Sequence, residues 1–190
     1  LNNGNRTWTR WSTNDGINVL IDPKNDGVIY GNVQTGLIVK SFSNGDGVNT
    51  SFWVTDGLQE TGAWDTPLVM NQENTNILYT ATNAAIYKTT NGALSWRRVG
   101  NFPSVRTLEL GVENPDIVYA HAFNNSSWSF YRSNNGGNTW TTINHSTIPS
   151  WGVTSLENHP SHPTWVYATR NSTFPNRDHV KWSKDSGNIW

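Results

Sequence analysis

The chain has 190 residues, with 13 Lys and Arg against 14 Asp and Glu and a formal net charge of −1. Charged residues are 14% of the total, so there is no basic patch of the kind that binds nucleic acid. No apolar run approaches the roughly 18 residues of a membrane-spanning helix, so we expect no membrane insertion. The absence of Cys excludes disulfides and thiolate metal sites, and we expect no cofactor.

Short strands are predicted in pairs along the whole chain. The first pair covers 17–21 and 28–31, two runs of β-branched and aromatic residues separated by a polar turn with Pro, which is typical of an antiparallel hairpin. Further pairs are predicted at 67–70 with 77–80, 107–110 with 117–120, and 153–156 with 165–168. A third short strand is predicted after each pair, at 37–40, 85–88, 128–132 and 180–182.

An eight-residue turn segment recurs after the third strands. The clean copies are 89–96, 133–140 and 183–190; the segment around 3–8 looks like another copy, and 41–53 is a degenerate one with an insertion. From Trp96 to Trp140 is 44 residues, and from Trp140 to Trp190 is 50. The Trp of the turn opens a fourth strand, such as 139–143. Four strands in each unit of this length is the arithmetic of β-propeller blades.

The repeated pattern Ser/Thr-x-Asp/Asn-x-Gly-x-Thr/Ser-Trp resembles the Asp box, or BNR repeat, of sialidase-like, sortilin-like and xyloglucanase-like β-propellers. The fuller pattern, with Asn14-Asp15-Gly16-Ile17 leading into Ile21-Asp22-Pro23, is most similar to secreted bacterial repeat propellers. The resemblance implies an all-β fold, a β-propeller built from four-stranded antiparallel blades of about 44 to 50 residues. The sequence departs from the pattern where Asn replaces Asp, Ala93 replaces Gly and Ile189 replaces Thr.

A single propeller segment over 1–190 is therefore expected. Its approximate blades are 12–53, 54–99, 100–143 and 144–190, and a strand at 7–11 would belong to a preceding or closing blade. That strand could close a four-bladed ring. Because rings of this type usually have more blades, we favour the alternative in which the chain is part of a larger propeller with further blades in the same parent chain.

The residues that recur in each copy of the turn are interpreted as structural. An Asp or Asn at its third position can accept hydrogen bonds from backbone N–H groups, Gly supplies positive φ, and the Trp ring can lie between neighbouring sheets. Four or five copies cannot all be one active site, and the repeated Tyr30, Tyr79, Tyr119 and Tyr167 are likewise assigned to blade packing. The structural Asp-box residues are Asn3, Trp8, Asn91, Trp96, Asn135, Gly137, Trp140, Asp185, Gly187 and Trp190.

A binding site is expected where the first strands of the blades begin, the end opposite the repeated turns. Trp beside Asp, Asn and Arg is a combination that suits a glycan or a protein partner; the alternative is that these residues merely cover the mouth of a central channel. Trp128 and the stretch 170–179 add to this end. The candidate binding residues are Trp11, Asn14, Asp15, Trp64, Asp65, Arg106 and Trp151.

Catalysis has weaker support in the sequence. Asp15 and Asp65 occupy equivalent places in successive blades and are the only pair of carboxylates that we nominate as acid and base of a glycoside hydrolase. The arginines do not recur at one position, which argues against a sialidase. His159 and His162 fit a hairpin turn rather than a metal site, and we assign no metal.

The sequence thus predicts a secreted or cell-surface propeller scaffold that binds a glycan or protein partner, for example in adhesion, and is not catalytic by itself. The alternative is a glycoside hydrolase of the xyloglucanase-like class with the paired aspartates. The lack of Cys fits a bacterial secreted protein better than a eukaryotic ectodomain.

Overall fold

A computed structural model describes residues 15–42, 51–143, 152–171 and 179–190. The predicted strand at 7–11 and the turn copy at 3–8 lie outside these residues. Apart from one short 3₁₀ segment, η1 (Gln34–Gly36), the regular structure of the described residues is entirely β. None of the helical structure in this part of the chain is long or apolar enough to cross a membrane.

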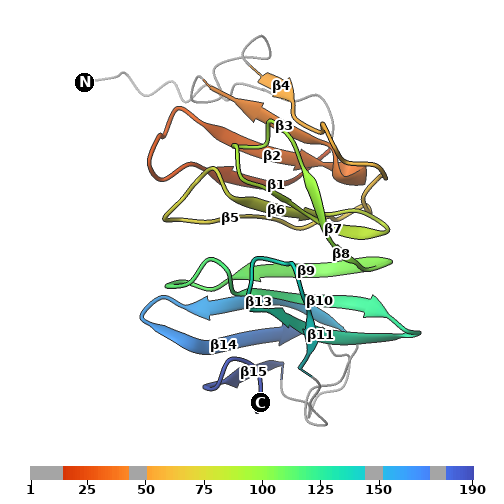
Figure 1. The fold of residues 1–190 in the computed structure, drawn as a ribbon, viewed down its shortest axis with the longest axis vertical. Helices are drawn as coiled ribbons and strands as arrows, with labels where there is room; N and C mark the ends of the chain where they lie inside the picture. Colours follow the sequence, from red (N-terminus) through yellow and green to blue (C-terminus); the bar gives the residue numbers. More distant parts are fainter. Residues whose placement is uncertain (1–14, 43–50, 144–151, 172–178) are drawn as a thin grey trace.

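The strands form four separate antiparallel sheets, in each of which spatial order follows chain order (Figure 1). The first sheet contains β1 (Gly16–Ile21), β2 (Ile29–Val33), β3 (Ile38–Ser41) and β4 (Ser51–Trp53). The second contains β5 (Leu68–Met70), β6 (Leu78–Ala81), β7 (Ala85–Thr89) and β8 (Arg97–Asn101). The third contains β9 (Ser104–Leu110), β10 (Val118–Asn124), β11 (Ser127–Ser133) and β12 (Thr141–Thr142), and the fourth β13 (Val153–His159), β14 (His162–Arg170) and β15 (Val180–Ser183). These sheets confirm the predicted strand pairs and third strands to within one or two residues at most ends.

The four sheets are stacked on one another, and their first strands are neighbours in the order β1, β5, β9, β13. The turns between first and second strands all lie at one end, on the left in Figure 1. The repeated turns lie at that end too. In the second and third sheets the turn donates a backbone hydrogen bond to the first-to-second-strand turn of its own sheet, from Gly92 to Asn76 and from Gly136 to Asp116, and in the fourth sheet Ser186 donates to Thr164 near the start of β14.

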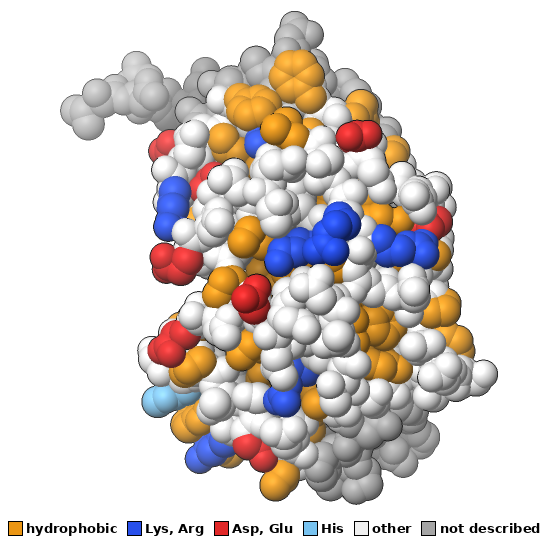
Figure 2. Space-filling view, in the orientation of Figure 1, with side chains coloured by type: hydrophobic (Ala, Val, Ile, Leu, Met, Phe, Trp, Pro, Cys, Tyr) orange, Lys and Arg blue, Asp and Glu red, His pale blue; other side chains and the backbone are white. Residues whose placement is uncertain are grey.

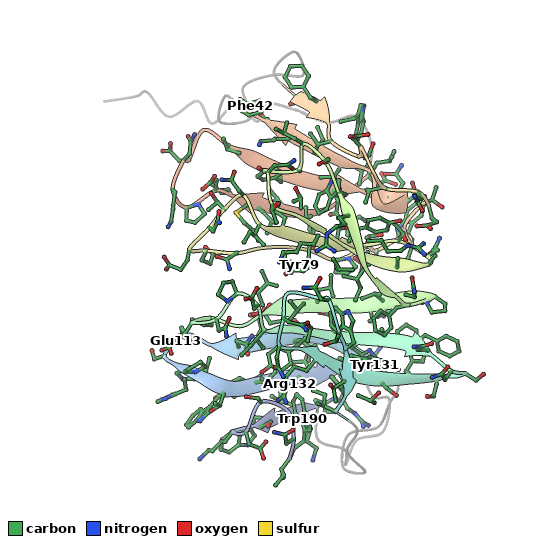
Figure 3. The ribbon with its side chains drawn as sticks, in the orientation of Figure 1. Phe42, Tyr79, Glu113, Tyr131, Arg132 and Trp190 are labelled. Carbon is green, nitrogen blue, oxygen red and sulfur yellow. The ribbon has the colours of Figure 1, made fainter. Side chains whose placement is uncertain are left out.

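The burial of one Tyr on each second strand shows how the sheets pack. Tyr30, Tyr79 and Tyr119 are 1%, 0% and 1% exposed, because the next sheet covers each of them, and Figure 3 shows Tyr79 between the second and third sheets. The equivalent Tyr167 is only partly buried. The last sheet therefore presents to solvent a face that the other three bury.

The first sheet exposes the face that each later sheet packs against the sheet before it. Val19 is 62% exposed, whereas its equivalents Leu68, Leu108 and Leu156 on the later first strands are 4%, 2% and 2% exposed. Ile21, two residues along β1 and on the same face as Val19, is 59% exposed, and Figure 2 shows hydrophobic side chains gathered over the first sheet. The stack thus ends in two exposed faces, one on the first sheet and one on the last. The equivalent face is buried in each of the other three sheets.

The repeated turn is held by the same hydrogen bonds in each clean copy. Asn135 Oδ1 accepts from the Ser133 hydroxyl at 3.0 Å and from the Thr139 backbone N–H at 2.9 Å, and the Ser133 hydroxyl accepts from the Gly137 N–H at 2.8 Å. Asn91 and Asp185 accept the corresponding backbone N–H bonds at 3.0 and 2.8 Å. The glycine positions have positive φ, +90° at Gly137. Backbone-accepting Asn or Asp side chains of this kind stabilise tight turns.

The Trp that follows each turn joins two sheets. The indole N–H of Trp96 in the second sheet donates to the Val54 carbonyl beside the first sheet at 2.7 Å, and that of Trp140 donates to Val99 on β8 at 2.9 Å. A basic residue on the third strand also joins two sheets. Lys40 Nζ donates to the Gly92 carbonyl at 2.9 Å, and Arg132 Nη1 donates to the Ser186 carbonyl at 2.8 Å. Each sheet is therefore fastened to the turn of the next.

Candidate functional site

Two hollows lie at opposite ends of the first strands. One opens among the first-to-second-strand turns and the other at the end where the first strands begin. Only the second lies at the end where the sequence predicts a binding site.

The hollow among the turns is central to the stack. Its volume is about 420 Å³, and it is lined by one equivalent residue from each first strand, Leu20, Val69, Glu109 and Glu157, together with the turns at 71–73 and 110–112. We call it the central cleft. Figure 2 shows an indentation on the left side, where these turns meet.

The two carboxylates of the central cleft have different surroundings. Glu109 is largely buried and its Oε1 accepts a backbone hydrogen bond from Asn158 at 3.3 Å, whereas Glu157 is exposed. Burial, reinforced by the negative charge of Glu157, raises the pKa of Glu109 to about 8. Glu109 therefore carries its proton at neutral pH. The sequence analysis missed both residues, although each is paired with the repeated Tyr of its sheet, Tyr119 and Tyr167, and that shared register marks them as equivalent.

The second hollow lies between the third and fourth sheets. Its volume is about 200 Å³, and Arg106, His121, Trp128, Gly152 and Val153 line it. We call it the Arg106 hollow. It contains one predicted binding residue, Arg106, and Trp128, which the sequence places at the same end. The buried His121 is the member that sequence reasoning did not select.

Backbone features of β9 and β13 shape the Arg106 hollow. His121 pairs with Thr107 and Ala122 pairs with Val105, so Arg106 is the extra residue of a β-bulge. Bulges redirect side chains and are frequent beside functional sites. Gly152 has φ of +81°, and a Cβ atom there would lie 2.8 Å from the Asn171 carbonyl oxygen, which leaves no room for a side chain at this wall of the hollow.

The other predicted binding residues do not converge on that hollow. Trp64 and Asp65 are exposed in the connection between β4 and β5, and Asp15 is exposed immediately before β1. The Trp64–Asp65 loop is anchored to the first sheet because the Thr66 carbonyl accepts from the side chains of Asn18 and Asn32 at 3.1 and 2.5 Å. Trp11, Asn14 and Trp151 lie outside the described residues.

Asp15 and Asp65 share few contacts with their surroundings. Neither carboxylate forms a hydrogen bond or ion pair with another residue in the part of the chain that the structure describes. His159 and His162 face each other across the β13–β14 turn with ring centroids 4.6 Å apart, and no group of three or more metal-ligating side chains occurs among the described residues.

Comparison with solved structures places this architecture. The chain superposes on an ancestral GH74 enzyme with a TM-score of 0.70 at 20% identity, covering 93% of this chain and 24% of that one. It also superposes on the GH74 xyloglucanase from Xanthomonas campestris (TM-score 0.65, 13% identity, 93% of this chain and 30% of that one). The described residues form part of a β-propeller. The four sheets are its blades, and the first strands line its central channel.

A further structural neighbour is not described as an enzyme. An auxiliary nutrient binding protein from Bacteroides thetaiotaomicron superposes with a TM-score of 0.59 at 13% identity, covering 82% of this chain and 36% of that one. The propeller segment thus spans about a quarter to a third of the length of these neighbours. No protein-family model and no curated protein matches the sequence.

Proposed function

We propose that this chain is part of a secreted or cell-surface β-propeller that binds a glycan at the end where the first strands begin. The observation that carries the proposal is the Arg106 hollow, where an aromatic ring and a cationic side chain line one cavity at the end predicted to bind a ligand. A flat indole ring can stack on the apolar face of a sugar, and a guanidinium can bond its oxygens. Binding residues on propellers gather around such channel mouths.

Several features support the wider setting of this proposal. The repeated turns resemble the Asp-box pattern in sequence and share one set of hydrogen bonds among themselves, which supports their assignment to that repeat family. The two unpaired end faces are suited to cover by further blades of the same parent chain. Among the neighbours, one is a xyloglucanase and another a nutrient binding protein, which fits a role in handling extracellular polymers, with a protein partner as the alternative ligand.

The glycan proposal is tested by affinity electrophoresis of the protein in gels that contain xyloglucan, galactan or pectin. Wild type should be retarded by at least one polysaccharide, and Trp128→Ala should run as in a gel without polysaccharide. Trp53→Ala removes an equally large exposed ring from β4, on the first sheet, and should leave the retardation unchanged. If no polysaccharide retards the wild type, or if Trp128→Ala behaves as wild type, the proposed site is wrong.

A glycoside hydrolase is the second candidate function, and the central cleft favours it. Glu109, protonated at neutral pH, has the property of a general acid, and the exposed Glu157 is placed to serve as the carboxylate partner. This pair differs from the predicted Asp15 and Asp65, which lie at the opposite end of the first strands.

Release of reducing ends from xyloglucan separates these pairs. If the protein is a hydrolase that uses the central cleft, Glu109→Gln and Glu157→Gln should each lower the rate by roughly 100-fold or more, since general acid–base catalysis contributes about that much. Asp15→Asn and Asp65→Asn should then leave it unchanged. The reverse pattern would assign the chemistry to the aspartates. If the wild type releases no reducing ends, the hydrolase candidate is rejected and only the binding function remains.

A further inference from the structure

The third blade departs from the repeat at the end that holds the Arg106 hollow. Counting from the repeated Tyr and its partner on the third strand, the second blade carries Thr66, Ala81 and Ala84 where the third blade carries Arg106, His121 and Trp128. The β10–β11 hairpin is also longer than β6–β7 and extends beyond the other sheets in Figure 1. Residues that repeat in every blade hold the fold, whereas a large polar and aromatic set in one blade is not required by it.

The aromatic wall of the hollow has a fixed orientation. The rings of His121 and Trp128 are stacked with centroids 5.1 Å apart and an interplanar angle of 16°. His121 is itself 1% exposed and packs against Phe130, with centroids 4.9 Å apart. Because the buried His121 ring supports it from beneath, Trp128 presents a preorganised surface to the hollow, which lowers the entropy cost of ligand binding.

Among the described residues, the cation of the hollow has no counterion. The exposed Arg106 makes no ion pair and no side-chain hydrogen bond with any residue of the ranges that the structure describes, and none of the described residues that line the hollow is a carboxylate. Elsewhere in the molecule Arg98 is paired with Glu60, and Arg132 donates to a backbone carbonyl. A guanidinium binds a carboxylate through two parallel hydrogen bonds, which a single hydroxyl cannot accept.

We propose that the Arg106 hollow binds a uronic acid residue of an acidic polysaccharide, with the sugar ring against Trp128 and its carboxylate on Arg106. This inference rests on the proposed glycan-binding function and specifies its ligand class. The hollow, at about 200 Å³, suits one sugar ring better than an extended ligand. An acidic peptide would supply the carboxylate but not the flat apolar face that the indole ring matches.

The test compares two ligands that differ at the carboxyl group, which is charged in one and a neutral methyl ester in the other. Tri-galacturonic acid and its methyl ester are titrated into the protein by isothermal titration calorimetry. Wild type should bind the acid roughly 10- to 100-fold more tightly than the ester, as expected for hydrogen bonds to a charged group, and added NaCl should weaken binding of the acid only. Arg106→Gln should bind the two ligands equally, and Arg106→Lys should retain part of the preference.

Control variants show that the effect belongs to the hollow. Arg97→Gln removes an exposed positive charge from β8, outside the hollow, and should keep the preference for the acid. All variants should give the wild-type far-ultraviolet circular dichroism spectrum and melting temperature, because Arg106 is exposed. A preference for the acid that persists in Arg106→Gln would overturn the inference.

The outcomes separate this inference from the glycan-binding function. Equal binding of acid and ester by wild type, lost in Trp128→Ala, would keep the function and overturn the uronate assignment. Binding of poly-glutamate as tight as that of the galacturonate would also overturn it, because charge alone would then suffice. Absence of binding to acid, ester and every neutral polysaccharide would overturn both.

Discussion

Replacing Trp96 with Ala should lower the free energy of unfolding by about 3 to 5 kcal/mol, the usual cost of removing a buried Trp side chain. The ring is 5% exposed, packs among the buried residues that join the first and second blades, and donates its indole N–H to the Val54 carbonyl at 2.7 Å. The substitution leaves a cavity between the blades and an unpaired carbonyl. Urea denaturation followed by circular dichroism measures the loss.

Trp64→Ala is the matched control for this prediction. Trp64 is 64% exposed in the β4–β5 connection, so its removal should change the free energy of unfolding by no more than about 0.5 kcal/mol. Trp96→Phe should fall between the two, because it keeps most of the buried apolar area but leaves the Val54 carbonyl without its donor. Equal urea midpoints for Trp96→Ala and Trp64→Ala would show that the Trp of the repeated turn does not join the blades.

Replacing Glu109 with Gln should make the protein more stable above neutral pH. In the unfolded chain Glu109 ionises near its ordinary pKa of 4.5, whereas in the folded protein burial and the charge of Glu157 hold the pKa near 8. Between these pH values the folded state holds a proton on Glu109 that the unfolded state has lost. The contribution of Glu109 to the wild-type stability is therefore complete below about pH 4.5 and is lost as the pH rises toward about 8. The total loss is about 5 kcal/mol, since each pH unit in this window costs about 1.4 kcal/mol.

The Gln variant removes this ionisation. Its amide oxygen can still accept from the Asn158 backbone N–H, so at pH 4.5 the two proteins should have nearly equal urea midpoints, and at pH 9 the variant should be more stable. Glu113→Gln, an exposed change of the same charge on the next turn (Figure 3), should follow the wild-type profile. Parallel profiles for wild type and Glu109→Gln between pH 4.5 and 9 would contradict the raised pKa.

Local sequence signals determined most of the fold. The alternation of β-branched and aromatic runs with Asn, Asp and Gly turns predicted strands such as 85–88 and 180–182, which the structure has as β7 and β15. These signals suffice because each sheet is a meander of consecutive strands, so none of the described strands pairs with a strand distant in sequence. The repeat then supplied the stacking, since Tyr79 and its equivalents had to be buried by something outside their own sheet.

The candidate site was less accessible to sequence reasoning, for a geometric reason. Arg106 was selected from its place at the start of a first strand, but the β-bulge that sets its direction leaves no sequence signature. Glu109 was missed because it stands between the apolar Leu108 and Leu110 of an ordinary strand, and Glu157 because the strand predicted there ended at Leu156. Only their pairing with Tyr119 and Tyr167 shows that Glu109 and Glu157, which are 48 positions apart in the sequence, occupy equivalent places on their strands.

The stacking of the blades implies that stability is distributed along the chain as a sum over neighbours. The second and third blades each contact two others, whereas a blade with one open face is held through a single interface. In such linear arrays the outer units open before the inner ones, and each unit added at an end strengthens the one it covers. The Arg106 hollow is built by the third and fourth blades, so a unit that covered Tyr167 would also stabilise one wall of the hollow.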